Sequence, residues 1–159
     1  MMEYKEEDSQ VQQVEKYDKN SANKWCIMGE TFELPDRFKV TDYLGAGAYG
    51  VVCAAWDKKN QKLIAIKKCK NIFQTRTLAR RTLRELRLLR LLDNSYIISL
   101  QNVLAPKSPG TFSSLYLCFE LMETDLASIV RSNQELSDVH VQVCMYVCVC
   151  VYICACEFA

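Results

Sequence analysis

Three glycines in the segment 44–52 are spaced as a site for phosphate groups. Gly45, Gly47 and Gly50 form the pattern GxGxxGxV, and β-prone runs lie on both sides of them. Because these positions lack side chains, backbone N–H groups can approach the phosphates of a nucleotide closely. A glycine-rich hairpin turn without a ligand is the alternative. A dinucleotide-binding βαβ unit is disfavoured, because a strand rather than a helix is expected after Gly50.

A lysine and a glutamate farther along the chain complete a set suited to holding phosphates. Lys67 ends the apolar run Ile64-Ala65-Ile66, and a charge on such a strand needs a partner. Glu85, in an arginine-rich helical segment, supplies a carboxylate that could hold it. Lys68 is expected to point to the opposite face and to reach the surface. The alternatives are a surface lysine at position 67 and a solvated helix carboxylate at position 85.

These features follow one another in the order of the protein-kinase signature: glycine loop, strand lysine, helix glutamate, and a strand ending in CFELMETDL. The details resemble the MAP kinases, through GAGAYGVVCAA, the double lysine, RRTLRELRLLRLL, ELMETDL and SNQELSD. The resemblance covers residues 32–142. It implies an α+β kinase small lobe, with an antiparallel sheet of about five strands, one long helix and no large lobe.

The resemblance also implies an ATP site. In such a site Phe119 would lie behind the adenine, the Glu120 carbonyl and the Met122 amide would face its edge, and Asp125 would lie near the ribose. Leu44 and Val52 would cover the base, Ala65 would pack against it, and Tyr49 would lie at the loop tip. The residues implied to bind the cofactor are Leu44, Gly45, Ala46, Gly47, Ala48, Tyr49, Gly50, Val51, Val52, Ala65, Lys67, Glu85, Phe119, Glu120, Met122 and Asp125.

Mg²⁺, protein substrates phosphorylated on serine or threonine, and an upstream kinase are implied in the same way. Arg84 matches the family position that contacts a phosphorylated activation loop. For the arginine run as a whole, a solvated helix face is favoured over a nucleic-acid surface, because only this helix is basic.

The residues that perform phosphoryl transfer in kinases are not found in these 159 residues. Kinase catalysis uses an aspartate to orient the substrate hydroxyl, and an asparagine and a second aspartate to hold Mg²⁺. The signatures HRDxxxxN and DFG do not occur, and the single histidine, His140, belongs to the start of a helix. We therefore expect no catalytic residue, no metal ligand, weak ATP binding and no activity.

Three hypotheses follow: a kinase-family sequence that is truncated or mis-spliced, a nucleotide- or partner-binding fragment, and an unstable product. The first is favoured.

The periodicity of apolar residues predicts the elements that position these side chains. The helix is placed by Leu78, Leu86, Leu89 and Leu92, which share one face. Strands are expected over 38–46, 49–57, 62–70, 96–106 and 114–121, the long helix over 75–93, and short helices from 124 and 136.

Composition excludes little. The formal charge is +1 and half of the residues are hydrophobic, which gives no bias toward nucleic acid or membrane. Residues 1–31 are expected to form a disordered polar leader without a secretory signal, so we expect reduced cysteines and a cytoplasmic location, with the nucleus as the alternative.

The last part of the chain changes character. Residues 143–159 are predicted to form a low-complexity tail, because the run VCMYVCVCVYICAC is what a TG-rich simple DNA repeat would encode. An edge strand, a membrane segment and a thiolate metal site are the alternatives for this tail.

Overall fold

The computed structural model describes residues 14–16, 24–47, 50–94, 97–105, 112–124, 126–132, 135, 137–140 and 142. Its main element is an antiparallel sheet of five strands in the order β4-β5-β6-β8-β7. The strands are β4 (Phe38–Gly47), β5 (Gly50–Asp57), β6 (Lys62–Cys69), β7 (Leu100–Leu104) and β8 (Leu115–Glu120). The predicted α+β architecture with about five antiparallel strands is therefore confirmed.

The sheet is buried on both faces, so its central strands are apolar almost throughout. Strand β6 shows how the pleat divides its side chains: Ile64 and Ile66 enter one cluster, and Ala65 and Cys69 enter the other. The first, which we call the hairpin-side cluster, comprises Ile27, Phe32, Leu34, Phe38, Val40, Val51, Cys53, Ala55, Ile64, Ile66, Tyr116 and Cys118. The second, the helix-side cluster, comprises Ala65, Cys69, Ile72, Leu115, Leu117 and Phe119.

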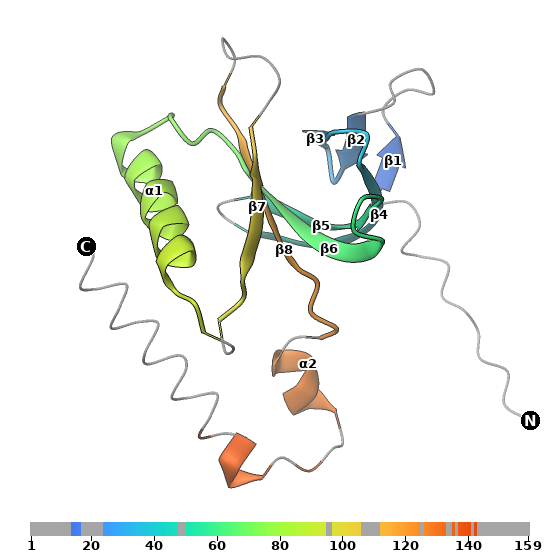
Figure 1. The fold of residues 1–159 in the computed structure, drawn as a ribbon, viewed down its shortest axis with the longest axis vertical. Coiled ribbons are helices and arrows are strands. Elements are labelled where there is room, and N and C mark those ends of the chain that lie inside the picture. The colour runs from blue at the N-terminus through green and yellow to red at the C-terminus, as the bar shows by residue number, and fades with distance from the viewer. Residues whose placement is uncertain are drawn as a thin grey trace, which may run out of the picture.

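Helix α1 (Arg76–Leu91) covers the helix-side cluster and lies beside strand β7 in Figure 1. It begins where the Thr75 hydroxyl accepts a hydrogen bond from the Leu78 N–H (3.1 Å), an N-cap that satisfies an otherwise unpaired donor. Leu86 and Leu89 pack against the sheet, as their spacing predicts. A second, short helix, α2 (Leu126–Arg131), follows β8.

A small sheet lies on the opposite side, in the order β1-β2-β3, formed by β1 (Val14–Lys16), β2 (Lys24–Ile27) and β3 (Glu30–Glu33). Ile27 and Phe32 are fully buried in the hairpin-side cluster. The turn between β2 and β3 has positive φ at both Met28 (50°) and Gly29 (76°), which matches the twist of a tight hairpin.

The structure here differs from the leader expected over residues 1–31, since 14–16 and 24–31 contain strands. The short apolar run over residues 25–28, followed by Gly29 and then Thr31-Phe32, is a hairpin signal that a polar average over the first residues hides. Residues 1–13, 17–23 and the predicted tail 143–159 lie outside the described residues.

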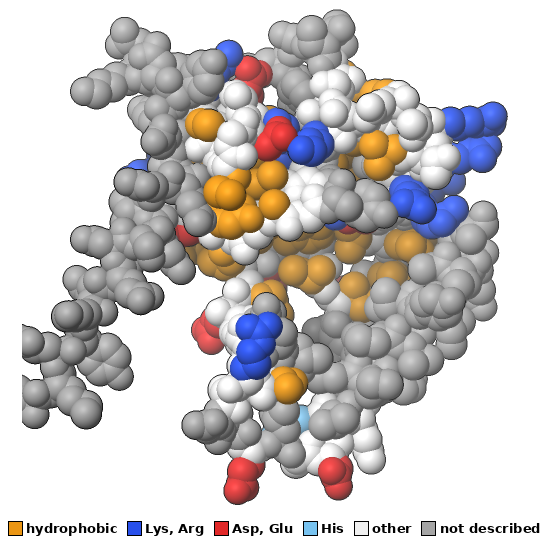
Figure 2. All heavy atoms as spheres, turned by 180° about the vertical axis from the view of Figure 1, so that it is seen from behind, with side chains coloured by type: hydrophobic (Ala, Val, Ile, Leu, Met, Phe, Trp, Pro, Cys, Tyr) orange, Lys and Arg blue, Asp and Glu red, His pale blue; other side chains and the backbone are white. Residues whose placement is uncertain are grey.

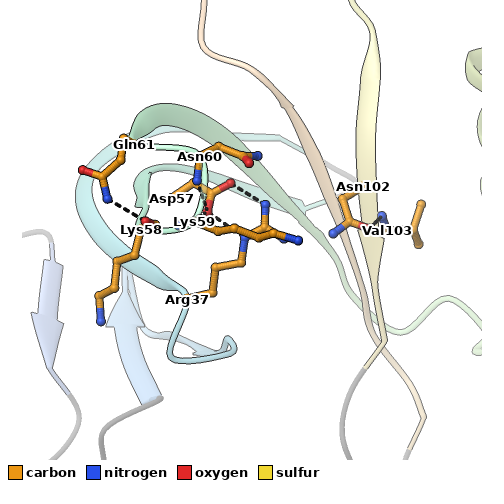
Figure 3. A network of polar contacts seen from close by, with 8 residues as sticks. All are labelled: Arg37, Asp57, Lys58, Lys59, Asn60, Gln61, Asn102 and Val103. Carbon is orange, nitrogen blue, oxygen red and sulfur yellow. Dashed lines mark hydrogen bonds and ion pairs between the residues drawn. The ribbon is translucent and has the colours of Figure 1, made fainter.

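A buried carboxylate closes the turn between β5 and β6 (Figure 3). Asp57 is 2% exposed and receives two hydrogen bonds from the Arg37 guanidinium, Nε to Oδ1 and Nη2 to Oδ2, both 2.6 Å. The same carboxylate accepts from the backbone N–H groups of Lys59 (3.0 Å) and Asn60 (3.4 Å). Hydrogen bonding by Arg37 is the main cause that lowers the pKa of Asp57. The chain before β4 is thereby joined to the β5–β6 turn.

We predict that Asp57→Asn lowers the free energy of unfolding by on the order of 3 kcal/mol at neutral pH, because Arg37 loses its charged partner. The folded-state pKa of Asp57 is lowered, so its contribution is present above the unfolded pKa of about 3.9 and is lost as pH falls through the folded value. Urea unfolding at several pH values measures both effects. The difference between wild type and variant should shrink below about pH 4.

The control is Asp42→Asn, which removes an exposed carboxylate from β4 and should change stability by less than about 0.5 kcal/mol. An equal loss in both variants, or a difference that grows in acid, would contradict this account.

Candidate nucleotide site

The site is built around Lys67, which the pleat of β6 turns toward the helix side. Lys67 pairs in register with Val52 on β5 and with Leu117 on β8, so its aliphatic stem lies among apolar neighbours. Its side chain remains 25% exposed, which leaves the ammonium accessible from solvent. A cation placed in this way is held by the sheet yet is available to an anion.

Glu85 on α1 supplies the partner that the sequence suggested. The Lys67 Nζ and Glu85 Oε1 atoms are 2.5 Å apart, and the Glu85 side chain is 38% exposed. Since Leu86 and Leu89 fix α1 on the sheet, the carboxylate is brought to β6 by packing rather than by the ion pair alone. The predicted approach of Lys67 and Glu85 is confirmed.

Lys68 points to the opposite face, as predicted, but it does not reach the surface. It is 9% exposed, and its Nζ donates to the Thr31 carbonyl (2.8 Å) and to Glu30 Oε2 (3.2 Å), over the Phe32 ring at 5.7 Å. The expectation of a surface lysine is wrong, because the β2–β3 hairpin covers this face and supplies an anion. Glu30 also receives a hydrogen bond from Lys70 (2.7 Å), the largest cause that lowers the pKa of Glu30.

The glycines differ in what they do for the β4–β5 hairpin. Gly50 has φ +156°, and a Cβ there would overlap the backbone carbonyl of Lys68 on β6. Gly50 therefore allows two backbones to lie in close contact. A Cβ at Gly45 or Gly47 would meet no atom within 4 Å, so these two face open space. Ala48 and Tyr49, expected at the tip, lie outside the described residues.

The apolar residues expected around an adenine are divided between the two faces. Val52, Ala65 and Phe119 belong to the same face as Lys67, and Ala65 pairs directly with Phe119. Val51 is buried in the hairpin-side cluster, so its side chain faces away from Lys67 and only its backbone is on the hairpin.

The remaining expected contacts lie at the edges. Leu44 is 47% exposed on β4, Glu120 is exposed at the end of β8, and Met122 is 63% exposed just beyond it. Ala46 pairs with Val51 across the hairpin, and Asp125 lies outside the described residues. The structure thus brings the glycine hairpin, the lysine and the small apolar surface to one side of the sheet.

A cavity of ≈240 Å³ lies beside this arrangement, lined by Cys69, Lys70, Ile72, Leu78, Arg81, Thr82 and Glu85. None of these residues belongs to the glycine hairpin or to the Ala65–Phe119 pair. The cavity therefore shares Glu85 with the candidate site but lies apart from its glycine hairpin and its apolar surface.

Three cysteines of the sheet have buried thiols. Burial raises the pKa of the Cys69 thiol, and it raises the pKa of Cys53 and of Cys118 to about 12, so these groups are protonated at neutral pH. Among the described residues, Cys26, Cys53, Cys69 and Cys118 are free cysteines. In the part of the chain that the structure describes, no group of acidic, histidine and cysteine residues could hold a metal ion, and no helix could span a membrane.

Comparison with known proteins decides the family. The model of the protein kinase domain matches residues 38–152, which is most of the chain. The chain belongs to the protein kinase family. The five-stranded sheet with α1 against one face is accordingly a kinase small lobe, and the resemblance to MAP kinases stated from the sequence is confirmed.

MAP kinases of plants are among the relatives of this kinase-family chain. It is 43% identical over 121 residues to mitogen-activated protein kinase 5 of Oryza sativa subsp. indica. The aligned region covers 76% of this chain and 33% of that protein. The chain is 43% identical over 121 residues to mitogen-activated protein kinase 3 of Arabidopsis thaliana (76% and 33%), and 40% identical over the same length to mitogen-activated protein kinase 6 (76% and 31%). The chain spans about a third of the length of these relatives.

We predict that substitution of Gly50 lowers the stability of this kinase lobe more than substitution of Gly47. Gly50→Ala should lower the free energy of unfolding by about 2 kcal/mol or more, because the added Cβ meets the Lys68 carbonyl and φ is unfavourable. Gly47→Ala, the matched control, should cost less than about 0.5 kcal/mol because the space is open. Urea unfolding of the two variants compares them directly, and equal destabilisation would contradict the close approach at Gly50.

Proposed function

We propose that the glycine hairpin, Lys67 and the surface around Ala65 bind ATP. The observation that carries the proposal is the Lys67–Glu85 ion pair on the same face of the sheet as Val52, Ala65 and Phe119. Kinases use ATP and Mg²⁺ and act on protein substrates, so the family supports this assignment in general terms. The finer assignment of residues is inferred from the arrangement described above.

Each group has a distinct part in this proposal. The open positions at Gly45 and Gly47 leave room for phosphates beside backbone N–H groups, and the Lys67 ammonium offsets the negative charge of the α- and β-phosphates. Through its ion pair, Glu85 would hold the Lys67 side chain on the face of the sheet where the nucleotide is proposed to bind. Ala65, with its short side chain, leaves space on the sheet for a flat base, which Phe119, Leu44 and Met122 would border.

Mg²⁺, when bound, would neutralise charge between the β- and γ-phosphates. The asparagine and aspartate that hold it in kinases are not among the described residues of this site. We therefore propose that, in these 159 residues, nucleotide binding is separate from phosphoryl transfer. Within a kinase with both lobes, this lobe would form the ATP-binding part of a serine/threonine phosphotransferase that resembles the MAP kinases.

A double-mutant cycle tests whether the ion pair acts as a unit in binding. Affinity for MgATP is measured by calorimetry for wild type, Lys67→Ala, Glu85→Ala and the double variant. We expect a coupling energy on the order of 0.5–3 kcal/mol, because each side chain positions the other. Lys62→Ala, at the exposed start of the same strand, is the control and should combine additively with Glu85→Ala. Additive effects of the first pair would show that the two residues are independent.

We further expect that the purified chain does not transfer phosphate from ATP to protein. Loss of one stabilising contact can cost on the order of 10²–10³ in rate, and here the catalytic aspartate and both metal-binding side chains are lacking together. The assay uses radiolabelled ATP, Mg²⁺ and a generic substrate with Ser-Pro and Thr-Pro sites. Labelling above background that disappears in Lys67→Ala would refute the expectation, whereas labelling that persists indicates a contaminating kinase.

A further inference from the structure

The outer face of α1 carries arginines and leucines at helical spacing. Residues three or four positions apart share one side of a helix, and every member of one such row, which we call the outer stripe, is exposed. It consists of Arg76, Arg80, Leu83, Arg87 and Leu91. Leu83 is 49% exposed and Leu91 is 67% exposed, so apolar surface alternates with positive charge.

The outer stripe lies on the side of α1 away from the sheet. Thr82, Leu86 and Leu89 form the buried side, and a helix with 3.6 residues per turn places the stripe roughly opposite to them. Figure 2, in which α1 lies on the right, shows Lys and Arg side chains gathered on that side of the body. The stripe is therefore distinct from the Lys67 site, which uses the sheet-facing side of α1.

The arginines of the stripe have no ion-pair partner among the described residues. In the described part of the chain, Arg76, Arg80 and Arg87 form no ion pair, and the first turn of α1 holds no acidic residue. Arg76 and Arg80 are like charges at i and i+4 near the positive end of the helix dipole, and both relations are unfavourable. An acidic partner would relieve them.

We infer that the outer stripe is a docking surface for an acidic protein segment with apolar side chains. Its carboxylates would face Arg76, Arg80 and Arg87, and its apolar side chains would cover Leu83 and Leu91. The arginines favour any anion, but the exposed leucines favour a protein segment over a nucleic-acid backbone, which offers a chain of phosphates and no apolar surface for them. Partner binding here would also stabilise the helix that carries Glu85.

The test uses the full chain and a short fluorescein-labelled helical peptide with glutamates and leucines on one face. Fluorescence anisotropy at near-physiological salt should show binding. The triple variant Arg76→Gln, Arg80→Gln, Arg87→Gln should weaken binding on the order of tenfold or more, because its charge partners are lost. The variant Leu83→Gln, Leu91→Gln should weaken binding on the order of tenfold or more, because both leucines lose the apolar cover that the peptide gives them. Replacing the peptide's glutamates by glutamine should abolish binding.

A matched control removes the same charge elsewhere. Lys39→Gln, Lys59→Gln, Lys62→Gln changes three exposed lysines of the β4–β6 region and should leave affinity within about twofold. Circular dichroism checks that every variant is folded. Unchanged binding in the stripe variants, or an equal loss in the control, overturns the proposal in favour of general charge attraction. A single-stranded oligonucleotide that binds through the arginines without dependence on Leu83 and Leu91, where the peptide does not bind, overturns it in favour of nucleic acid.

Discussion

Two adjacent lysines on β6 must leave the sheet on opposite faces, and much of the molecule is arranged around that constraint. A strand buried on both sides cannot leave an ammonium group unpaired without a large desolvation cost. Lys67 meets Glu85 on α1, and Lys68 meets Glu30 and the Thr31 carbonyl on the β2–β3 hairpin. The helix and the hairpin thus each supply both an apolar cover and an anion for one face of the same strand.

The same strand also controls the glycine hairpin. The Lys68 carbonyl lies against Gly50, where a side chain would not fit, so β5 and the start of the hairpin are set by the backbone of β6. Gly45 and Gly47 lie beyond this contact and face open space. One backbone contact therefore fixes the β5 side of the hairpin next to its turn, while the β4 side stays accessible. A phosphate site needs this combination of a fixed backbone and open space.

Partly exposed and buried ion pairs have different consequences in this lobe. Lys67 and Glu85 are both accessible, so their attraction is screened by solvent and α1 is held mainly by Leu86 and Leu89. Asp57 is almost fully buried and receives four hydrogen bonds, so its pairing with Arg37 is structural. In the proposed ATP site the accessible pair would be free to respond to a nucleotide, while the pair formed by the buried Asp57 maintains the sheet.

The sequence by itself determined the strands of the main sheet, the span of α1 and the pairing of Lys67 with Glu85, the last through the resemblance to kinases. Apolar periodicity repeats every two or 3.6 residues and is visible locally, which is why these elements were predicted within a few residues. Only the tertiary structure decided that Lys68 is buried, because its partner Glu30 lies on a hairpin far away in sequence. The Arg37–Asp57 contact and the close approach that requires glycine at position 50 could not be predicted for the same reason. Each depends on how elements that are separate in the sequence pack together, and no local sequence pattern contains that information.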